Sequence, residues 1–292
     1  MDKQLKLGLP KGSLESSTLK LFDQAGWKIS VRSRHYFPTV NDSALSCKLV
    51  KSRELGPYVE SGVLDCGLTG QDWIIENNSD VEEICGLNYS KATDQGCRWV
   101  LVVKNNSPIQ SIQDLTGKTI VTELMGFTTR YLQEKNIDAT VQHSWGATEA
   151  KVVEGLADAA VEITETGTTI RAHGLRIVED LLHTHTVFVA NKQAMREPWK
   201  RKKIENIALM LESAIAARDK VLLKLNAPIG KLDQIVGVLP SLHAPTINSL
   251  HGDNWVAVET VINRSQTREL IPLLKAAGAE GILELNITKL VG

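Results

Sequence analysis

Short strand-like runs alternate with helical patterns through the middle of this chain, and this alternation restricts its fold more than any other feature. Strand candidates at 98–104, 119–124, 139–145 and 159–164 are separated by helix candidates at about 127–135 and 147–156. Glycine-containing loops join them, and a strand that returns parallel to its neighbour needs a crossover of this kind. The order therefore predicts a parallel sheet covered by helices, in an α/β domain that begins near residue 98.

The first 97 residues predict a separate βα-type domain. A strand candidate at 4–9 runs into a Pro-Lys-Gly turn and then into an amphipathic helix, for which Ser13 is the expected N-cap and Gly26 the expected end. Strand signals return at 45–50 and 64–70, separated by the segment 53–62.

The last third predicts a long helix followed by a small α+β module. Apolar residues at helical spacing run from Arg196 to about Asn226, with Pro198 near the start. Beyond them we expect strands at 232–240 and 255–263, a helix at 266–279 and a strand at 280–290. A unit of about 70 residues is an ordinary size for a small domain.

Composition and charge exclude several classes of function. Hydrophobic residues make up 42% of the chain, which suits a folded core, and the net charge of −1 leaves no basic excess for binding nucleic acid. No apolar run has the length of a membrane span, and the N-terminal residues lack the pattern of a secretory signal. The four cysteines have no metal-site spacing, so we expect reduced thiols in a cytoplasmic protein.

The segment VEITETGTTIRAHG, residues 161–174, combines features that suit a phosphate with features that repel one. Thr166, Gly167, Thr168 and Thr169 form a turn at the start of a helix candidate, where amides and hydroxyls favour an anion, but Glu162 and Glu165 lie beside it. A sugar phosphate offers an ester for the turn and hydroxyls for a carboxylate. The simpler alternative is that a threonine only caps the helix.

Two turns in the first domain are further candidates. LGLPKGS places Lys11 at a turn tip, as a point charge for a phosphate or as a solvated lysine. LDCGLTGQD places Thr69, Gly70 and Asp72 after a buried strand, where ligands of α/β sheets bind, although an ordinary turn would also explain it. The chain has no G-x-S-x-G, Walker or G-x-G-x-x-G motif, so no nucleophile for covalent catalysis is indicated.

Four motifs in order resemble the long form of ATP phosphoribosyltransferase, the first enzyme of histidine biosynthesis. They are LPKGSL, YVESGVLDCGLTGQDWI, GATEAKVVEGLADAAVEITETGTTIRAHGL, and a set of C-terminal segments from LPSLHAPTINSL to IPLLKAAGAEGILELNITKL. The resemblance implies two α/β domains like those of type II periplasmic binding proteins, with the active site between them. It places the catalytic domains at 1–97 with 191–218 and at 98–190, and an ACT-like regulatory domain at 219–292.

The resemblance also implies the reaction and its substrates. The family transfers the phosphoribosyl group of phosphoribosyl pyrophosphate to N1 of ATP, releases pyrophosphate and uses Mg²⁺; the metal ligands are left unassigned. The catalytic candidates are Glu162, Glu165 and Lys11. The phosphoribosyl pyrophosphate candidates are Glu162, Thr164, Glu165, Thr166, Gly167, Thr168 and Thr169. The ATP candidates in the first domain are Lys11, Gly12, Ser13, Lys51, Arg53, Thr69, Gly70 and Asp72.

Histidine is the implied feedback inhibitor, and AMP is a further candidate inhibitor. Asn226, Leu242, Thr246 and Gly281 match the effector pocket by position. The expected partners are these small molecules and further copies of the chain, from dimer to hexamer, with no nucleic acid and no membrane.

The chain departs from the family pattern at four places. Ser13 replaces an arginine, residues 51–55 (KSREL) replace an Arg-Pro-x-Asp-Ile run, Glu162 replaces aspartate and Asn226 replaces an acidic residue. Lysine cannot reproduce bidentate guanidinium contacts, so either Lys51 or Arg53 is the phosphate partner there. The rival hypotheses are a non-catalytic sensor or solute-binding protein with the same cleft, and another phosphoribosyltransferase that accepts free bases.

Overall fold

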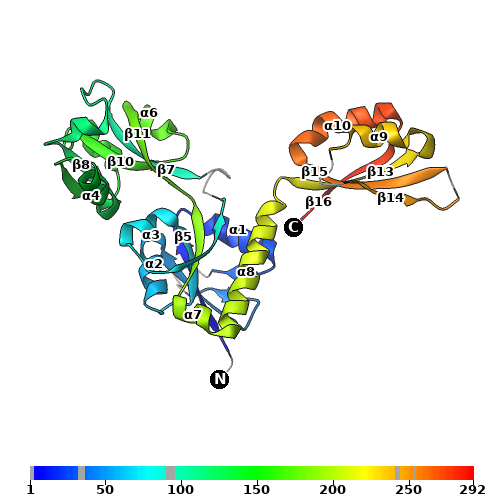
Figure 1. Cartoon of the computed structure of the whole chain (residues 1–292), viewed down its shortest axis with the longest axis horizontal. Helices are drawn as coiled ribbons and strands as arrows, with labels where there is room; N and C mark the ends of the chain where they lie inside the picture. Colours follow the sequence, from blue (N-terminus) through cyan, green and yellow to red (C-terminus); the bar gives the residue numbers. More distant parts are fainter. Residues whose placement is uncertain (1–2, 32–36, 90–95, 241–243, 253) are drawn as a thin grey trace. The chain divides into compact units, whose positions relative to one another are not determined.

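The structure, a computed structural model, describes residues 3–31, 37–89, 96–240, 244–252 and 254–292. It divides into two compact units, the first ending at residue 208 and the second covering 209–292 (Figure 1). The first unit contains two five-stranded sheets, and the second contains one four-stranded sheet. We call each sheet of the first unit, with its helices, a lobe. The predicted α/β class with a C-terminal α+β module is confirmed.

The first lobe is built on the sheet β4-β1-β5-β12-β6. Its strands are β1 (Leu5–Lys11), β4 (Leu45–Lys51), β5 (Cys66–Gly70), β6 (Glu82–Leu87) and β12 (Thr186–Ala190), with a two-stranded ribbon of β2 (Ile29–Ser30) and β3 (Thr39–Val40). Its helices are α1 (Glu15–Ala25), α2 (Ser52–Glu60), α3 (Gln71–Asn77) and α7 (Lys192–Arg196). Leu55 and Val59 of α2 pack with Val187 and Val189 of β12, so apolar side chains of α2 cover this sheet.

The second lobe is built on the sheet β11-β7-β10-β8-β9. Its strands are β7 (Cys97–Lys104), β8 (Thr119–Thr122), β9 (Thr140–His143), β10 (Ala159–Thr164) and β11 (Leu175–Thr184). Its helices are η1 (Ile112–Leu115), α4 (Met125–Glu134), α5 (Thr148–Val153) and α6 (Thr168–Ala172).

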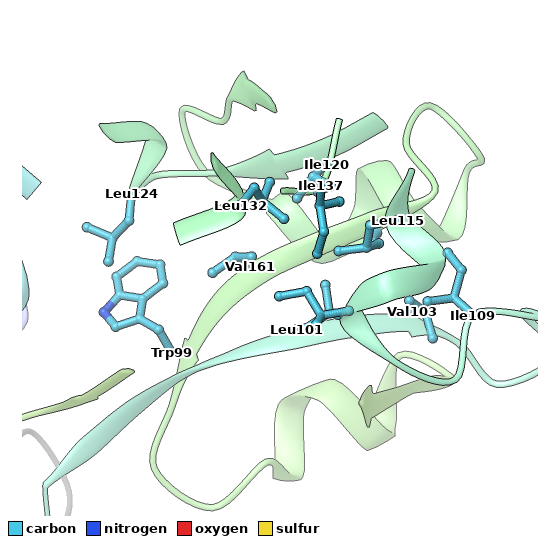
Figure 2. Close-up of a cluster of buried hydrophobic side chains, with 12 residues drawn as sticks. Trp99, Leu101, Val103, Ile109, Leu115, Ile120, Leu124, Leu132, Ile137 and Val161 are labelled. Carbon is cyan, nitrogen blue, oxygen red and sulfur yellow. The ribbon is translucent and has the colours of Figure 1, made fainter. Parts of the chain in front are cut away.

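Both faces of the second sheet are buried. Along β7, Trp99, Leu101 and Val103 join a cluster with Leu115 of η1 and Leu132 of α4, which Figure 2 shows. The alternate residues Val100 and Val102 join a second cluster with Val152 of α5 and Ile170 of α6. Successive side chains on a strand point to opposite faces, so this continuous apolar run is the pattern of a central strand.

The two sheets of the first unit repeat one arrangement. Each has three parallel strands, β4-β1-β5 in one and β9-β8-β10 in the other, then an antiparallel strand, β12 or β7, and then an edge strand. The antiparallel strand is in each case the one by which the chain enters that sheet from the other lobe. The prediction of a purely parallel second sheet is therefore wrong, because β7 runs antiparallel to both β10 and β11.

The return crossing lies close to residue 185. The predicted boundary at 190 placed Thr186–Ala190 in the second domain, whereas β12 pairs with β5 and β6 of the first sheet. In both lobes, the parallel strands lead into loops that carry candidate site residues. Ligands of open α/β sheets bind at these carboxyl ends.

Helix α1 begins later than the sequence predicts. The predicted N-cap Ser13 is wrong: Leu14 occupies that position without a side-chain hydrogen bond. The amide of Glu15 donates to the carbonyl of Gly12 at 3.1 Å, and the carboxylate of Glu15 accepts from the amide of Gly12 at 3.4 Å. This turn leaves the side chain of Ser13 outside the helix cap. The predicted end at Gly26 is confirmed, with a left-handed φ of 111°.

Helix α3 of the first lobe contacts the second lobe at three elements. The carboxylate of Asp72 accepts a hydrogen bond from Trp99 Nε1 of β7 at 2.7 Å, and the amide of Asp72 donates to Thr184 Oγ1 of β11 at 3.1 Å. The carboxylate of Glu76 accepts from the amides of Gly126 and Phe127, at 2.8 and 2.7 Å. These are the first amides of α4, so this helix receives its N-terminal cap from the other lobe.

The second unit corrects two predictions. Helix α8 (Pro198–Ala216) ends ten residues before the predicted end, and Lys220–Pro228 forms strand β13. Residues 232–240, predicted as a strand, contain helix α9 (Leu232–Val238). The buried residues Ile235 and Leu239 are four apart and so follow the helical period, whereas Val221, Leu223 and Leu225 alternate along β13.

The remaining elements of this unit form one layered module. They are η2 (Ile229–Lys231), β14 (Thr246–Ser249), β15 (Trp255–Asn263), α10 (Arg264–Ala277) and β16 (Glu280–Asn286), with the sheet order β14-β15-β13-β16. Helices α9 and α10 lie on one face of the sheet and bury one apolar cluster against it (Figure 1). No helix of the described ranges, in either unit, is both long and apolar enough to cross a bilayer.

Candidate active site

The predicted phosphate loop connects β10 to α6. The hydroxyl of Thr164, the last residue of β10, accepts a hydrogen bond from the amide of Gly167 at 2.8 Å. Gly167 has a φ of 74°, and a Cβ atom there would lie 3.0 Å from Arg171 Nη1 and 3.1 Å from Ile177 Cδ1. Glycine is therefore required both by the backbone conformation and by its neighbours.

The polar groups of this loop are mainly threonine hydroxyls. Thr166, Thr168 and Thr169 are exposed, and the hydroxyls of Thr166 and Thr168 lie 2.9 Å apart. Helix α6 has only five residues, so its dipole adds less than a longer helix would. Arg171 donates to the carbonyl of Thr166 at 3.1 Å and so holds the loop from behind. The loop offers donors on one side of an open cavity.

That cavity has a volume of about 430 Å³ and brings the predicted residues together. It is lined by Ser13 of the first lobe and by Cys97, Glu149, Glu162, Ile163, Thr164, Glu165, Thr166, Thr168, Thr169 and Ile170. Its size is that of a small-molecule site. Threonine hydroxyls and three carboxylates therefore line the same cavity, as a sugar phosphate requires.

Glu162 is electrostatically unusual. Burial, together with the neighbouring carboxylates Glu149 and Glu123, raises the pKa of its carboxyl group to about 7, while a hydrogen bond with Thr148 opposes the shift. A neighbouring cation or hydroxyl donor would stabilise the charged form of a carboxyl group whose pKa is raised in this way.

Cys97 lines the same cavity but is not a nucleophile. Burial raises the pKa of its thiol to about 11, and the charge of Glu165 adds to the shift, so the thiol stays neutral. All four cysteines are free thiols.

Protein side chains alone do not complete a metal site. Within the described ranges, no group of three or more His, Cys, Asp and Glu side chains could hold a metal ion. Glu162 and Glu165 nevertheless present hard oxygen atoms to the cavity. One or two carboxylates, with a substrate diphosphate and water, are the usual ligands of Mg²⁺, so the residues fit a metal that arrives with the substrate.

The turn after β1 and the end of β4 bring two lysines together. Lys11 and Lys51 are the last residues of these parallel strands and are register partners, so they lie side by side at the carboxyl edge of the first sheet. Like charges opposite one another are unfavourable unless an anion compensates them. Gly12 follows with a left-handed φ of 111° and open space around it, and Ser13 lines the cavity.

Two of the three candidates after β5 are used inside the protein. Thr69 is fully buried, and its hydroxyl donates to the carbonyl of Ser52 at 2.8 Å. Asp72 is 2% exposed and bonded to Trp99, and burial raises the pKa of its carboxyl group. A Cβ atom on Gly70 would lie 2.1 Å from the Asp72 carboxylate, so this glycine makes room for it. These contacts give Thr69 and Asp72 a positioning role, and direct contact of either residue with a ligand stays a prediction.

A second cavity of about 320 Å³ lies near Arg53. Its lining combines α2 and α3 of the first lobe with the strand ends of the second, namely Arg53, Glu54, Pro57, Tyr58, Trp73, Glu76, Asn77, Glu123 and His143. Sequence reasoning missed Glu123 and His143, which follow and end β8 and β9. Their place at the carboxyl ends of parallel strands is the signal that could have found them.

The effector candidates lie in the second unit. Gly281 has a φ of 57°, and a Cβ atom there would lie 3.3 Å from Asn226 Nδ2, so the two residues adjoin across a register shift between β13 and β16. Thr246 of β14 pairs with Glu259 of β15, which forms an ion pair with Lys224 at 2.7 Å. Leu242 lies outside the described residues.

Comparisons with known proteins agree over the whole chain. A family model described as HisG: ATP phosphoribosyltransferase matches residues 51–213, and one described as HisG, C-terminal domain matches residues 217–289. An ATP phosphoribosyltransferase of Geotalea daltonii is 53% identical over 291 residues, covering 100% of both chains. ATP phosphoribosyltransferase 1 of Geobacter sulfurreducens is 52% identical over the same length, again with full coverage of both.

A solved structure shares the fold. The ATP phosphoribosyl transferase (HisG:HisZ) complex from Thermotoga maritima aligns with a TM-score of 0.62 at 24% identity, covering 72% of this chain and 99% of that one.

Proposed function

The chain belongs to the ATP phosphoribosyltransferase family, and from this premise we propose where each substrate binds and how the reaction is promoted. The enzyme transfers the phosphoribosyl group of phosphoribosyl pyrophosphate to N1 of ATP, the first step of histidine biosynthesis. The observation that carries our assignment of the site is the 430 Å³ cavity, which is lined by both threonine hydroxyls and carboxylates.

Phosphoribosyl pyrophosphate occupies this cavity in our proposal. Its 5-phosphate lies on the loop of Thr166, Gly167, Thr168 and Thr169, and the ribose hydroxyls donate to Glu162. Three exposed or lining hydroxyls and a close backbone approach at Gly167 support the phosphate end. Thr164 fixes the loop through the amide of Gly167. Glu165 faces the same space, on the side where the diphosphate and its metal would lie.

The triphosphate of ATP lies at the carboxyl edge of the first sheet. Lys11 and Lys51 are register partners there, and their two positive charges attract a polyanion. Gly12 leaves room for a phosphate, and Ser13 adds a hydroxyl between this edge and the ribose cavity. Arg53 lies one residue beyond Ser52, at the second cavity.

Catalysis follows from charge and position. Departure of pyrophosphate leaves positive charge on the ribose ring, and the carboxylate form of Glu162 stabilises that charge and holds the ribose hydroxyls. Mg²⁺, the proposed metal, would neutralise the leaving diphosphate. Lys11 holds the acceptor nucleotide, so that N1 meets the anomeric carbon without a covalent enzyme intermediate.

A spectroscopic assay tests the function. With ATP, phosphoribosyl pyrophosphate and Mg²⁺, the protein is expected to form phosphoribosyl-ATP, which is followed by the change in adenine absorbance. Pyrophosphate should be released in an equal molar amount. Omission of either substrate is the control. Binding of both substrates without a new chromophore would instead indicate a sensor, and turnover with free bases would indicate another phosphoribosyltransferase.

We place histidine feedback in the second unit. Asn226 and Gly281 adjoin at the bulge of β16, and we propose that histidine binds at this corner of the sheet, with Thr246 as a further contact and with AMP as a second inhibitor acting elsewhere. Inhibition at such a site must act by favouring one of two states of the enzyme.

Substitution of Gly281 tests this placement. Gly281→Val is expected to raise the half-inhibitory concentration of histidine at least about tenfold, because valine is strained at this φ and crowds Asn226. Basal activity should persist. Gly237→Val, in α9 with nothing within 4 Å, is the matched control. Asn226→Asp should act in the opposite direction, since a carboxylate attracts the amino group. Unchanged inhibition in both variants at Asn226 and Gly281 would place the effector elsewhere.

We also propose that the chain is a homo-oligomer and works in the cytoplasm. The sheet face away from α9 and α10 carries Leu222, Val261, Leu283 and Leu285, of which Leu283 is 53% exposed. An apolar sheet face of this kind supports contact between copies, from dimer to hexamer. The free thiols agree with a reducing compartment. A single monomer peak by sedimentation at micromolar concentration would contradict the oligomer.

A further inference from the structure

Trp145 is the most exposed large aromatic side chain among the described residues, and two flat side chains, those of His143 and Arg53, lie near its ring. Its side chain is 81% exposed, on the loop that follows β9. The ring of His143 lies 4.2 Å from it between centroids, and the guanidinium carbon of Arg53, from the first lobe, lies 5.9 Å from its centroid. A solvent-facing indole held in this way is a ready stacking surface.

The loop that carries Trp145 is held rigidly and under strain. Gly146 and Ala147 both have positive φ, 119° and 49°, and the value for Ala147 is unfavourable for a residue with a Cβ. Ser144 is fully buried; its amide donates to the carbonyl of Thr122 at 2.8 Å, and its hydroxyl accepts from Lys151 at 2.9 Å. The backbone is therefore fixed while the indole is presented outward.

One polar atom in the adjoining cavity has no hydrogen-bond partner among the described residues. His143 lines the 320 Å³ cavity, and its Nδ1 atom is buried with no hydrogen-bond partner among the residues that the structure describes. A buried ring nitrogen without a partner suits a base edge, which offers both donors and acceptors.

One observation places this cavity next to the ribose cavity, and a second makes it less suited to a triphosphate than to a base, although Arg53 also lines it. Glu123 lines the second cavity and interacts electrostatically with Glu162 of the first, so the two sites are close neighbours. Glu54 and Glu123 also give the second cavity carboxylates that repel a triphosphate but accept hydrogen bonds from an exocyclic amino group. The charged tail of ATP therefore fits the lysine edge, and its base fits here.

We propose that the exposed ring of Trp145, next to Arg53 and His143, stacks on the adenine of the acceptor ATP and sets the affinity for that substrate. This inference rests on the proposed placement of the substrates. Base–aromatic stacking orients the ring without selecting strongly among bases, so selection of adenine falls to the polar edge groups His143 and Glu123.

The test compares Trp145→Ala with Trp145→Phe in the full-length enzyme. The alanine variant is expected to raise the KM for ATP roughly fivefold to a hundredfold, the range that loss of one base–aromatic stack gives, and to leave the KM for phosphoribosyl pyrophosphate unchanged. The phenylalanine variant keeps a ring and should recover most of the affinity. Because the side chain is 81% exposed, neither variant removes core packing. Leu156→Ala, at a side chain 73% exposed, is the control for loss of exposed apolar surface.

Fluorescence supplies a readout independent of turnover. Addition of ATP alone should quench the emission of the wild-type enzyme more than that of Trp145→Phe, since the stacked indole is missing from the variant. A wild-type KM for ATP in Trp145→Ala, with equal quenching in wild type and Trp145→Phe, would overturn the inference. Failure of the wild-type enzyme to form product would instead overturn the proposed function, so the two failures are distinct.

Discussion

The pH profile of kcat/KM is expected to rise from acid pH to a plateau above about pH 7, with Glu162 as the group that titrates. Burial and the carboxylates of Glu149 and Glu123 raise its pKa to about 7. Below that pH the carboxyl group is protonated and neutral, so it cannot stabilise the cationic ribose; above it the charge is present. The rate should therefore fall about tenfold per pH unit below the pKa.

Two variants make this expectation specific. Glu162→Gln is expected to lower kcat at pH 8 by about a hundredfold, as loss of one electrostatic contact to a transition state does, and to remove the acid limb of the profile. Glu149→Gln removes a neighbouring negative charge, so it should move the limb to lower pH while Glu162 stays in place. Measurement of kcat/KM from pH 5.5 to 9 checks both. A limb that survives in Glu162→Gln would assign the titration to another group.

Thr168→Asp is expected to raise the KM for phosphoribosyl pyrophosphate at least about tenfold, because the new carboxylate would lie beside the ester phosphate on this loop and repel it. The side chain is exposed, so the fold should be retained. Steady-state kinetics with saturating ATP gives the KM, and far-UV circular dichroism checks the fold.

Thr140→Asp is the matched control. It makes the same substitution at another exposed threonine, at the amino end of β9. It should leave the KM unchanged. If both variants behave alike, or if Thr168→Asp retains the wild-type KM, the phosphate does not lie on this loop.

The sequence predicted the elements whose pattern is local. The strand at 159–164 and the helix over 266–279 follow from a period of two and a helical period, and the structure has them at Ala159–Thr164 and Arg264–Ala277. The segment 220–228 was misread because Leu222 continues the helical spacing of Ile215 by chance, while the alternation of Val221, Leu223 and Leu225 is what the sheet buries. Length and period could have separated these two.

The arrangement of the two lobes could not be predicted from spacing. The sequence shows no internal repeat, yet both sheets have the same strand order, because the arrangement depends on which strand the chain enters by and not on residue identity. The roles of Thr69 and Asp72 were likewise hidden, since their partners Ser52 and Trp99 are 17 and 27 residues away.

The candidate phosphate loop can be named from the sequence because its residues are contiguous. Thr166 to Thr169 need no distant partner to be recognised. The proximity of Trp145 and Arg53 could not be predicted from the sequence, because the two residues belong to separate lobes and are brought together only by the fold.

Because Glu76 of the first lobe caps helix α4 of the second, hydrogen exchange at two amides of α4 reports the separation of the lobes. Gly126 and Phe127 keep their hydrogen bonds only while Glu76 is within reach. Deuterium uptake at these positions should therefore track each parting of the lobes, and a bound substrate that holds them together should slow it. Exchange at two backbone amides would then report how often the lobes part as nucleotides bind and leave, with no chemical modification of the enzyme.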